Sequence, residues 1–306
     1  MKRVLLTGAT GFIGRHALPL LIERGYEVHA TTHALPVGGE QNAALWHQVD
    51  FMDPVAVAGL VGTIKPSHLL HFAWYAEPGK YWASEQNFRW VQASMHLLEA
   101  FGNNGGKRVV MAGTCAEYDW GYGRCIENQT PIRPSSIYGA CKVAMQHLLE
   151  AYGRRFAMST AWGRIFHLYG PHEHRARLVP SVILPLLSGQ TAPCSSGEQQ
   201  RDFLHVKDVA SAFAALLNSD VMGPVNIGSG QPIAVRDVVE RIAAQIGRPA
   251  LVRLGDQQSR PDESPLLVAD VSRLTNEVKW APFYNLDAGL ASTIAWWREQ
   301  SSKVGV

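Results

Sequence analysis

The chain has 306 residues, of which 46% are hydrophobic and 18% charged, and its net charge is +2. These values are typical of a globular protein with one large domain or two smaller ones, and they exclude a disordered chain. So small a net charge gives no reason to expect a nucleic acid or a membrane as partner. No apolar run approaches the roughly 18 residues that span a bilayer, and the N-terminal apolar stretch meets glycines without a signal-peptide cleavage pattern.

Predicted strands and helices alternate along the first part of the chain. Their order predicts βαβ units, and therefore an α/β fold with a Rossmann-like, doubly wound parallel sheet covered on both faces. Pro19 inside the first helix is expected to kink or tighten it. We expect strands at residues 2–7, 26–31, 67–73 and 107–113, and helices at residues 12–24 and 91–101.

The pattern changes near Tyr169, where a stretch rich in Pro, Gly, His and Arg begins. Amphipathic helices are expected farther on, at residues 235–246 and 286–298. We therefore predict two units. Residues 1–168 form the Rossmann-like domain, to which residues 203–225 return, and residues 169–202 and 226–306 form a smaller C-terminal α/β lobe.

The four cysteines, Cys115, Cys125, Cys141 and Cys194, form no C-x-x-C pair. This spacing argues against a zinc site and against a redox dithiol. Free thiols are typical of a cytosolic protein, so we expect a cytoplasmic location. Residues 172–174 read His-Glu-His, but no third ligand is indicated, and no metal site is predicted.

A glycine-rich loop follows the first predicted strand directly. Glycines in this context let the chain turn tightly and let a pyrophosphate approach the backbone at the start of a helix. We therefore expect a dinucleotide to bind here. The alternative is a glycine turn that only packs the helix on the strand. The loop reads Gly8-Ala9-Thr10-Gly11-Phe12-Ile13-Gly14.

The end of the second predicted strand bears on the choice of cofactor. An acidic residue normally binds the ribose 2′-hydroxyl there, but this chain has Thr31-Thr32-His33 and no carboxylate before Glu40. We expect NAD(P), with a slight preference for NADP, and we expect Arg15 and His33 to provide positive charge for a 2′-phosphate. Alternatively, Arg15 is a solvated helix residue and His33 a loop residue.

Four further residues are expected at the cofactor. Asp50 and Phe51 follow another predicted strand, where they can meet the adenine, although Asp50 equally fits a helix cap. Phe72 and Ala73 stand at the end of the strand predicted at residues 67–73.

Tyr138 and Lys142 are four residues apart, which places a phenol and an ammonium on the same face of a helix. A free phenol has a pKa of about 10, too high for acid–base chemistry at neutral pH. Because a neighbouring cation favours the phenolate, Lys142 is expected to lower the pKa of Tyr138. Thr114 follows the strand predicted at residues 107–113 and can donate a hydrogen bond to the oxygen that Tyr138 protonates. Alternatively, Tyr138 and Lys142 are ordinary surface residues.

Together these segments resemble the extended short-chain dehydrogenase/reductase family, in its nucleotide-sugar epimerase, dehydratase and reductase branch. The resemblance covers nearly the whole chain. It implies a bound nicotinamide dinucleotide, a nucleotide-sugar substrate, a C-terminal lobe that binds this substrate, and a homodimer. It also implies that Thr114, Tyr138 and Lys142 are catalytic. The matching segments are TGATGFIG, GTCAEY, YGACK, RIFHLYGP, RDFLHVKDVA, PVNIGSG and RPDESPLLVAD.

The resemblance also implies contacts to the substrate. Arg201 and Arg260 match arginines that hold the diphosphate, which suits the fork of a guanidinium. Alternatively, Arg201 pairs with a neighbour such as Asp202. Further substrate positions carried over from the family are His167, Arg177, Leu178 and Asn226.

The segment at residues 74–82 is unusually aromatic, and it is expected to lie over the active site and to shape the sugar pocket. Tyr75 is the residue of this segment that we expect to touch the substrate. Alternatively, the segment is a hydrophobic lid or a dimer contact. Glu117, Tyr118 and Asp119 form another polar cluster, to which the sequence assigns no role.

Departures from the family pattern narrow the reaction. The 4,6-dehydratases carry an Asp-Glu pair where this chain has Cys115 and Ala116, so dehydration loses its acid and base. The epimerase/reductases that act at two carbons use a cysteine and a histidine where this chain has Ala116 and Arg177. Our first prediction is therefore reduction of a nucleotide-linked 4-keto-(6-deoxy)hexose, with Tyr138 as general acid. The alternatives are a 4-epimerase with tightly bound NAD and a non-catalytic dinucleotide-binding regulator.

Overall fold

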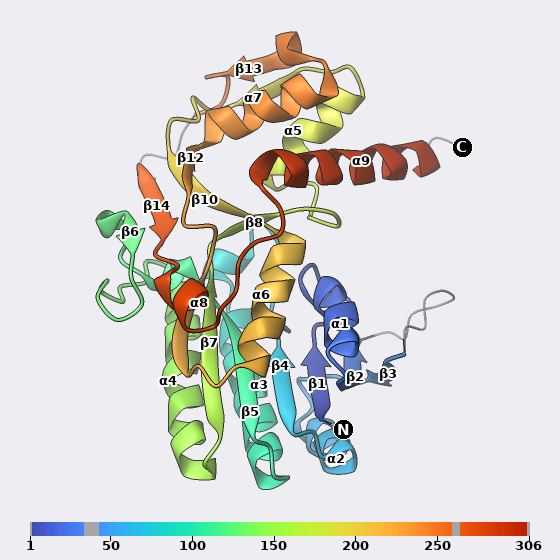
Figure 1. Cartoon of the computed structure of the whole chain (residues 1–306), viewed down its shortest axis with the longest axis vertical. Helices are drawn as coiled ribbons and strands as arrows, with labels where there is room; N and C mark the ends of the chain where they lie inside the picture. The colour runs from blue at the N-terminus through green and yellow to red at the C-terminus, as the bar shows by residue number, and fades with distance from the viewer. Residues whose placement is uncertain (1, 34–42, 259–263, 305–306) are drawn as a thin grey trace.

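The computed structural model describes residues 2–33, 43–258 and 264–304. Its largest sheet has seven parallel strands in the order β11-β7-β5-β4-β1-β2-β3 (Figure 1). This confirms the predicted Rossmann-like α/β class. The strands are β1 (Arg3–Thr7), β2 (Glu27–Thr32), β3 (Leu45–Gln48), β4 (His68–His71), β5 (Arg108–Thr114), β7 (Ser159–Ile165) and β11 (Gly223–Ile227).

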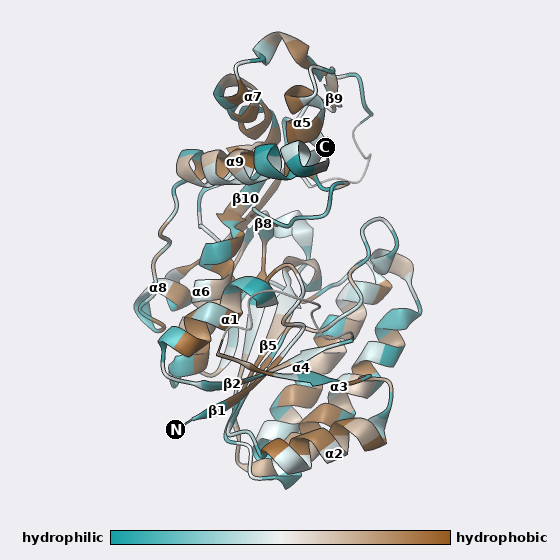
Figure 2. Cartoon of the chain, turned by 90° about the vertical axis from the view of Figure 1, so that its right-hand side faces the viewer, coloured by the Kyte–Doolittle hydropathy of each residue, from teal (hydrophilic) through white to brown (hydrophobic). Residues whose placement is uncertain are grey.

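Helices cover both faces of this sheet, as Figure 2 shows. Side chains alternate along β1, so Val4 and Leu6 pack under α1 and α6, while Leu5 packs under α2 and α3 on the opposite face. Because both faces are buried, the central strands carry apolar runs, at residues 4–6, 69–70 and 109–112. The helices are α1 (Gly14–Glu23) and α6 (Val206–Asn218) on one face, and α2 (Pro54–Ile64), α3 (Gln86–Asn103) and α4 (Ile137–Phe156) on the other.

The C-terminal lobe is built around strand β10, which pairs with β8, β12 and β14. Helices α5, α7 and α9 enclose its core, and Figure 1 shows them above the large sheet. The strands are β6 (Arg124–Cys125), β8 (His167–Tyr169), β9 (Ala192–Cys194), β10 (Gln200–His205), β12 (Pro232–Ala234), β13 (Val252–Leu254) and β14 (Leu266–Ala269). The helices are α5 (Leu178–Leu187), α7 (Val235–Ile246) and α9 (Leu286–Val304), whereas α8 (Ser272–Asn276) packs against β11 of the large sheet.

The chain crosses between the two sheets more than once. Strand β10, which includes residues 203–205, belongs to the lobe, and the return to the large sheet begins with α6 at Val206 and continues through β11. Pro19 lies inside α1, which continues to Glu23. Within the described ranges, no helix is long and apolar enough to cross a membrane.

Candidate active site

The glycine loop lies between β1 and α1, where three backbone segments meet. Gly8 has φ +67° and accepts a hydrogen bond from the N–H of Gly11 at 2.9 Å. A Cβ on Gly14 would lie 2.1 Å from the carbonyl oxygen of Gly8, and a Cβ on Gly8 would lie 2.9 Å from the nitrogen of Ala73 and 3.1 Å from the carbonyl carbon of Phe72. Only glycine fits this approach, and it brings Phe72 and Ala73, two of the predicted cofactor contacts, against the loop.

Helix α1 begins directly after the loop, and no side chain of the described residues caps its first turn at Ile13. The positive end of the helix dipole favours an anion at such a position. A turn without room for a Cβ at Gly8 and Gly14, followed by an uncapped helix, fits the pyrophosphate of a dinucleotide. Thr10 on this turn is exposed, and Phe12 and Ile13 are half-buried.

Arg15 is exposed and lies beside the glycine loop. Its guanidinium donates to the carbonyl oxygens of Thr10 at 2.6 Å and Gly11 at 3.2 Å, and to Nδ1 of His172 at 2.6 Å. These contacts hold it against the loop and the lobe. His33 is exposed and follows the last residue of β2. Of the two residues proposed to provide positive charge, only His33 lies at the end of that strand.

The predicted adenine contacts follow strand β3. Phe51 is buried, with its ring centroid 6.3 Å from that of Trp90. Asp50 is exposed, and its carboxylate accepts a hydrogen bond from the N–H of Met52 at 2.9 Å. The alternative prediction that Asp50 caps the following helix is wrong, because Asp53 caps α2 and accepts from the helix N–H groups.

Thr114, Tyr138 and Lys142 come together at the end of β5 and the start of α4. Ser136 caps α4 by accepting a hydrogen bond from the N–H of Gly139 at 3.1 Å. A Cβ on Gly139 would lie 2.5 Å from the carbonyl oxygen of Ala116, so the helix starts directly against the turn after Thr114. This approach allows a hydrogen bond between the side chains of Thr114 and Tyr138. Nζ of Lys142 lies 5.9 Å from the centroid of the Tyr138 ring.

The net effect of the protein is to raise the pKa of Tyr138, contrary to the prediction. Burial raises the pKa of this phenol well above its usual value, the nearby Tyr81 adds to the rise, and the hydrogen bond with Thr114 opposes it. Burial also lowers the pKa of Lys142 to about 7, although Glu117 and Cys141 favour its charged form. The prediction failed because it counted the neighbouring cation and omitted the removal of the phenol from water, which disfavours the phenolate.

An aromatic wall, made of Tyr81, Trp82 and Trp120, surrounds the Tyr138 ring. The ring centroids of Tyr81 and Trp82 lie 4.8 Å and 5.8 Å from that of Tyr138, both edge-on, and Trp120 packs edge-on against Trp82 at 6.3 Å. The predicted aromatic segment therefore does lie beside Tyr138. Tyr75, the residue singled out in it, is half-buried, and Tyr81 and Trp82 are the residues of this segment that pack on Tyr138.

The Glu117 cluster, made of Glu117, Trp162, Arg164, Tyr118 and Gln146, is buried behind Thr114. Glu117 accepts hydrogen bonds from the N–H of Thr114 at 2.8 Å, Nε1 of Trp162 at 2.9 Å and Nε of Arg164 at 2.6 Å. Arg164 also donates to the Tyr118 hydroxyl at 2.9 Å and to Oε1 of Gln146 at 2.6 Å. Glu117 and Tyr118 thus hold the turn that carries Thr114.

Asn226 belongs with this cluster rather than with a substrate site. Its side chain is fully buried, accepts from the Tyr118 hydroxyl at 2.8 Å and donates to the carbonyl oxygens of Cys125 at 2.9 Å and Asp270 at 3.1 Å. The amide therefore ties β11 to the lobe, and we correct its predicted role as a substrate contact.

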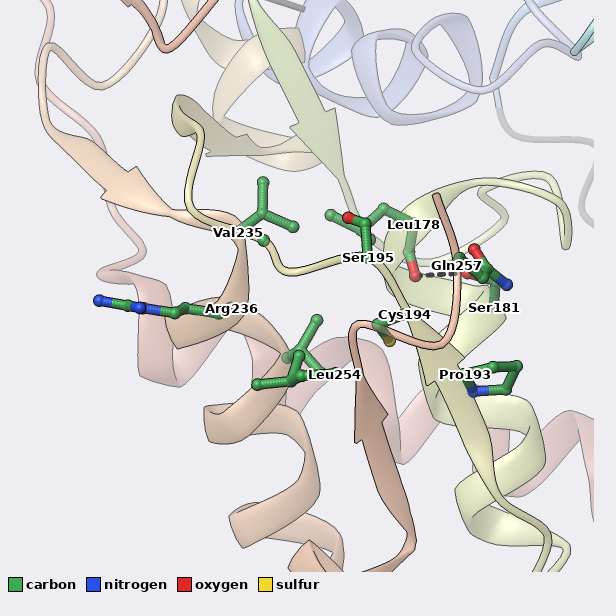
Figure 3. A pocket seen from close by; sticks show the side chains of 11 residues that line it. Leu178, Ser181, Pro193, Cys194, Ser195, Val235, Arg236, Leu254 and Gln257 are labelled. Carbon is green, nitrogen blue, oxygen red and sulfur yellow. Dashed lines mark hydrogen bonds between the residues drawn. The ribbon is translucent and has the colours of Figure 1, made fainter. Parts of the chain in front are cut away.

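A pocket in the lobe lies at the start of α5 and has a cavity volume of about 80 Å³ (Figure 3). Leu178, Cys194, Ser195 and Val235 are among its lining residues. Arg177 precedes Leu178, and its guanidinium lies 5.5 Å from the centroid of the Tyr81 ring in the aromatic wall. Arg177 and Leu178 therefore connect the surroundings of Tyr138 to this pocket.

The other predicted substrate residues are placed differently. Arg201 is buried and donates to the carbonyl oxygens of Gln200 and Ser264, both at 2.8 Å. Nδ1 of His167 is buried without a hydrogen-bond partner among the described residues, and burial with the nearby Arg201 lowers the pKa of this imidazole to about 3. Arg260 lies outside the described residues.

Comparisons with known proteins agree with the Rossmann-like fold. A model of the NAD-dependent epimerase/dehydratase family matches residues 4–228. UDP-glucuronic acid decarboxylase 1 of Xenopus tropicalis is 26% identical over 98% of this chain and 73% of that protein, and dTDP-glucose 4,6-dehydratase of Neisseria gonorrhoeae is 25% identical over 99% and 97%. The structure of UDP-glucose 4-epimerase of Thermus thermophilus with NAD is 27% identical, with a TM-score of 0.84 over 97% of this chain and 99% of that one.

These matches confirm the resemblance. The family model matches well over half of the chain, and the relatives are enzymes, so we do not pursue the regulator alternative. The chain is an enzyme that belongs to the NAD-dependent epimerase/dehydratase family, whose members act on nucleotide sugars.

Proposed function

We propose that the protein reduces the keto group of a nucleotide-linked 4-keto-(6-deoxy)hexose. When bound, the nicotinamide of NAD(P)H supplies the hydride to the carbonyl carbon. Thr114 donates a hydrogen bond to the carbonyl oxygen, and Tyr138 gives that oxygen its proton as the negative charge develops. Lys142, when protonated, stabilises the resulting phenolate, which opposes the effect of burial on the pKa of Tyr138.

One observation carries this proposal: the turn that follows Thr114 offers no free carboxylate. Cys115 and Ala116 occupy the two positions after it, and Glu117 is bonded to Arg164 at 2.6 Å. A site with Tyr138 as its proton donor suits reduction of a carbonyl, whereas elimination of water from a sugar needs a further acid and base.

The nucleotide end of the substrate is assigned to the pocket at the start of α5. Relatives are named for UDP and dTDP sugars, which carry a base, a diphosphate and a hexose. We place the base near Leu178 and the diphosphate near Arg177, whose exposed cation suits an oxyanion. The sugar then lies against Tyr81 and Trp82, next to Tyr138.

A 4-epimerase with tightly bound NAD is the second candidate, because one solved relative is a UDP-glucose 4-epimerase in complex with NAD. Both reactions need only hydride transfer at one carbon and Tyr138 as the proton partner. We propose that the enzyme prefers NADP to NAD, because β2 is followed by His33 and not by a carboxylate. We also propose a homodimer, which light scattering tests.

The decisive experiment incubates the purified enzyme with UDP- and dTDP-linked 4-keto-6-deoxyhexoses and with NADPH or NADH. We expect the absorbance of NADPH to fall as the ketone is consumed. Tyr138→Phe should lose roughly 10²–10⁴-fold in kcat and keep its affinity for NADPH. If a UDP-hexose is interconverted without net consumption of cofactor, and NAD copurifies with the protein, the epimerase is correct and the reductase is wrong.

A further inference from the structure

The ammonium of Lys142 is held from two sides. Nζ lies 3.7 Å from the centroid of the Trp74 ring and donates a hydrogen bond to the carbonyl oxygen of Ala112 at 2.9 Å. A cation over the face of an indole is attracted by the negative charge of the ring face, and this attraction is strongest where water is excluded. Lys142 is buried, so Trp74 is a main partner of its charge.

The indole itself is fixed by Asn87, a fully buried residue of α3. Nε1 of Trp74 donates to Oδ1 of Asn87 at 2.9 Å, and the amide group of Asn87 donates to the carbonyl oxygens of Tyr81 at 2.7 Å and Ser84 at 2.8 Å. Tyr81 packs edge-on against Tyr138. One side-chain amide therefore fixes the indole that holds Lys142 and the backbone of Tyr81, whose ring packs on Tyr138.

Other groups face Lys142 from the elements around it. Glu117, on the turn after β5, and Cys141, on α4, favour the ammonium, while burial opposes it. His71 of β4 is near enough that Lys142 lowers the pKa of this imidazole. The rings of Tyr138 and Trp162 have their centroids 5.9 Å from Nζ. The Glu117 carboxylate also pairs with Arg164, so a substitution of Glu117 would break the Glu117 cluster. A substitution of Trp74 removes a contact of Lys142 and leaves that cluster in place.

We propose that Trp74 is a positioning residue of the active site, which keeps Lys142 protonated beside Tyr138 and is itself oriented by Asn87. The inference rests on the proposed role of Lys142 in catalysis. It assigns a purpose to the first tryptophan of the aromatic segment, which does not belong to the aromatic wall. A leucine in its place would leave the site apolar and remove the negative ring face, so the ammonium would lose stabilisation.

The test compares Trp74→Leu with Trp74→Phe in the full chain. Nζ of Lys142 is followed by NMR in protein labelled with ¹⁵N-lysine, with its signal assigned by its loss in Lys142→Met. We expect Trp74→Leu to lower the pH of half-protonation by about one unit, the size of a desolvated cation–π contact. Trp74→Phe, which keeps a ring face, should stay within a few tenths of a unit of the wild type. Trp82→Leu is the control, because Trp82 touches Tyr138 instead.

Activity gives the second readout. The alkaline limb of the pH profile of kcat/KM should move down by about one unit in Trp74→Leu and stay in place in Trp74→Phe. Equal half-protonation of Lys142 in the wild type and Trp74→Leu, or a rise in Trp74→Leu, overturns the inference. The NMR measurement needs no substrate. A shift in Trp74→Leu without turnover of any nucleotide sugar therefore supports the role of Trp74 and counts only against the proposed function.

Discussion

Two buried polar clusters meet at Thr114. They differ in how many of their polar groups have hydrogen-bond or ion-pair partners. In the Glu117 cluster, the carboxylate and the guanidinium of Arg164 are bonded to each other and to three further side chains. In the catalytic cluster, Lys142 has one carbonyl and one ring face, and burial lowers its pKa to about 7. The Tyr138 hydroxyl shares a hydrogen bond with Thr114, and burial raises its pKa.

The difference separates stability from chemistry. A buried group with all its partners is held in one protonation state and one position, which suits the support of a turn. A buried group with few partners has a shifted pKa and can exchange a proton near neutral pH, which suits catalysis. The two clusters are adjacent, so the rigid one can fix the backbone of Thr114 while the other changes its charge. Each of the following experiments separates the two kinds of burial.

The largest effect on stability is expected in the Glu117 cluster. Arg164→Met leaves the fully buried Glu117 carboxylate without its cation, and we expect the free energy of unfolding to fall by about 3–5 kcal/mol. Urea denaturation followed by tryptophan fluorescence measures this loss. The double variant Glu117→Leu/Arg164→Met removes both charges and should recover part of it. A loss below about 1 kcal/mol in Arg164→Met would show that the buried ion pair contributes no more to stability than a surface pair does.

A smaller and pH-dependent effect is expected at Glu173. Its carboxylate is buried, Oε2 has no hydrogen-bond partner in the described part of the chain, and burial raises its pKa from 4.5 to about 8 against the opposing effect of Arg177. The folded state therefore holds a proton that the unfolded state releases, and stability falls as the pH rises from about 4.5 to 8. Glu173→Gln should unfold like the wild type at pH 4 and be more stable by about 2–4 kcal/mol at pH 9.

Thermal denaturation across this pH range checks the Glu173 prediction. Glu240→Gln, at an exposed position on α7, is the control and should show no such slope. If the difference in stability between the wild type and Glu173→Gln is the same at pH 4 and at pH 9, the carboxyl group of Glu173 is not protonated in the folded state.

The parts of the molecule that the sequence predicts best are those with a local cause. The glycine loop, the first two strands and the helix at residues 235–246 follow from glycine spacing and hydrophobic periodicity, and the structure places them within one or two residues of the prediction. Tyr138 and Lys142 lie one turn apart because their spacing alone determines it. Strand β3 is short and only partly buried, so tertiary contacts define it, whereas the Ala- and Leu-rich α6 has a helical pattern that the prediction missed.

The site residues that the sequence misplaced depend on distant partners. Asn226 matches a family segment, but its amide is used by Tyr118 and two carbonyl groups from other parts of the chain. Asn87 carries no sequence signal, since its role comes from the position of Trp74 thirteen residues earlier. One sequence feature could have predicted the close contact of Gly139 with Ala116, namely the small residue directly after Tyr138. The prediction used only the spacing of Tyr138 and Lys142.

The smallest effect is expected for an ion pair of the same chemistry at the surface. Arg241 of α7 donates to both oxygens of Asp287 on α9, at 2.8 Å and 2.7 Å, but their side chains are 45% and 60% exposed, against 2% and 0% for Arg164 and Glu117. Water solvates both groups in the folded and unfolded states, so Arg241→Ala should cost less than about 1 kcal/mol, and added salt should reduce even that. Urea denaturation at low and high salt measures both values. If Arg241→Ala costs as much as Arg164→Met, burial is not what distinguishes the stability contributions of these two ion pairs.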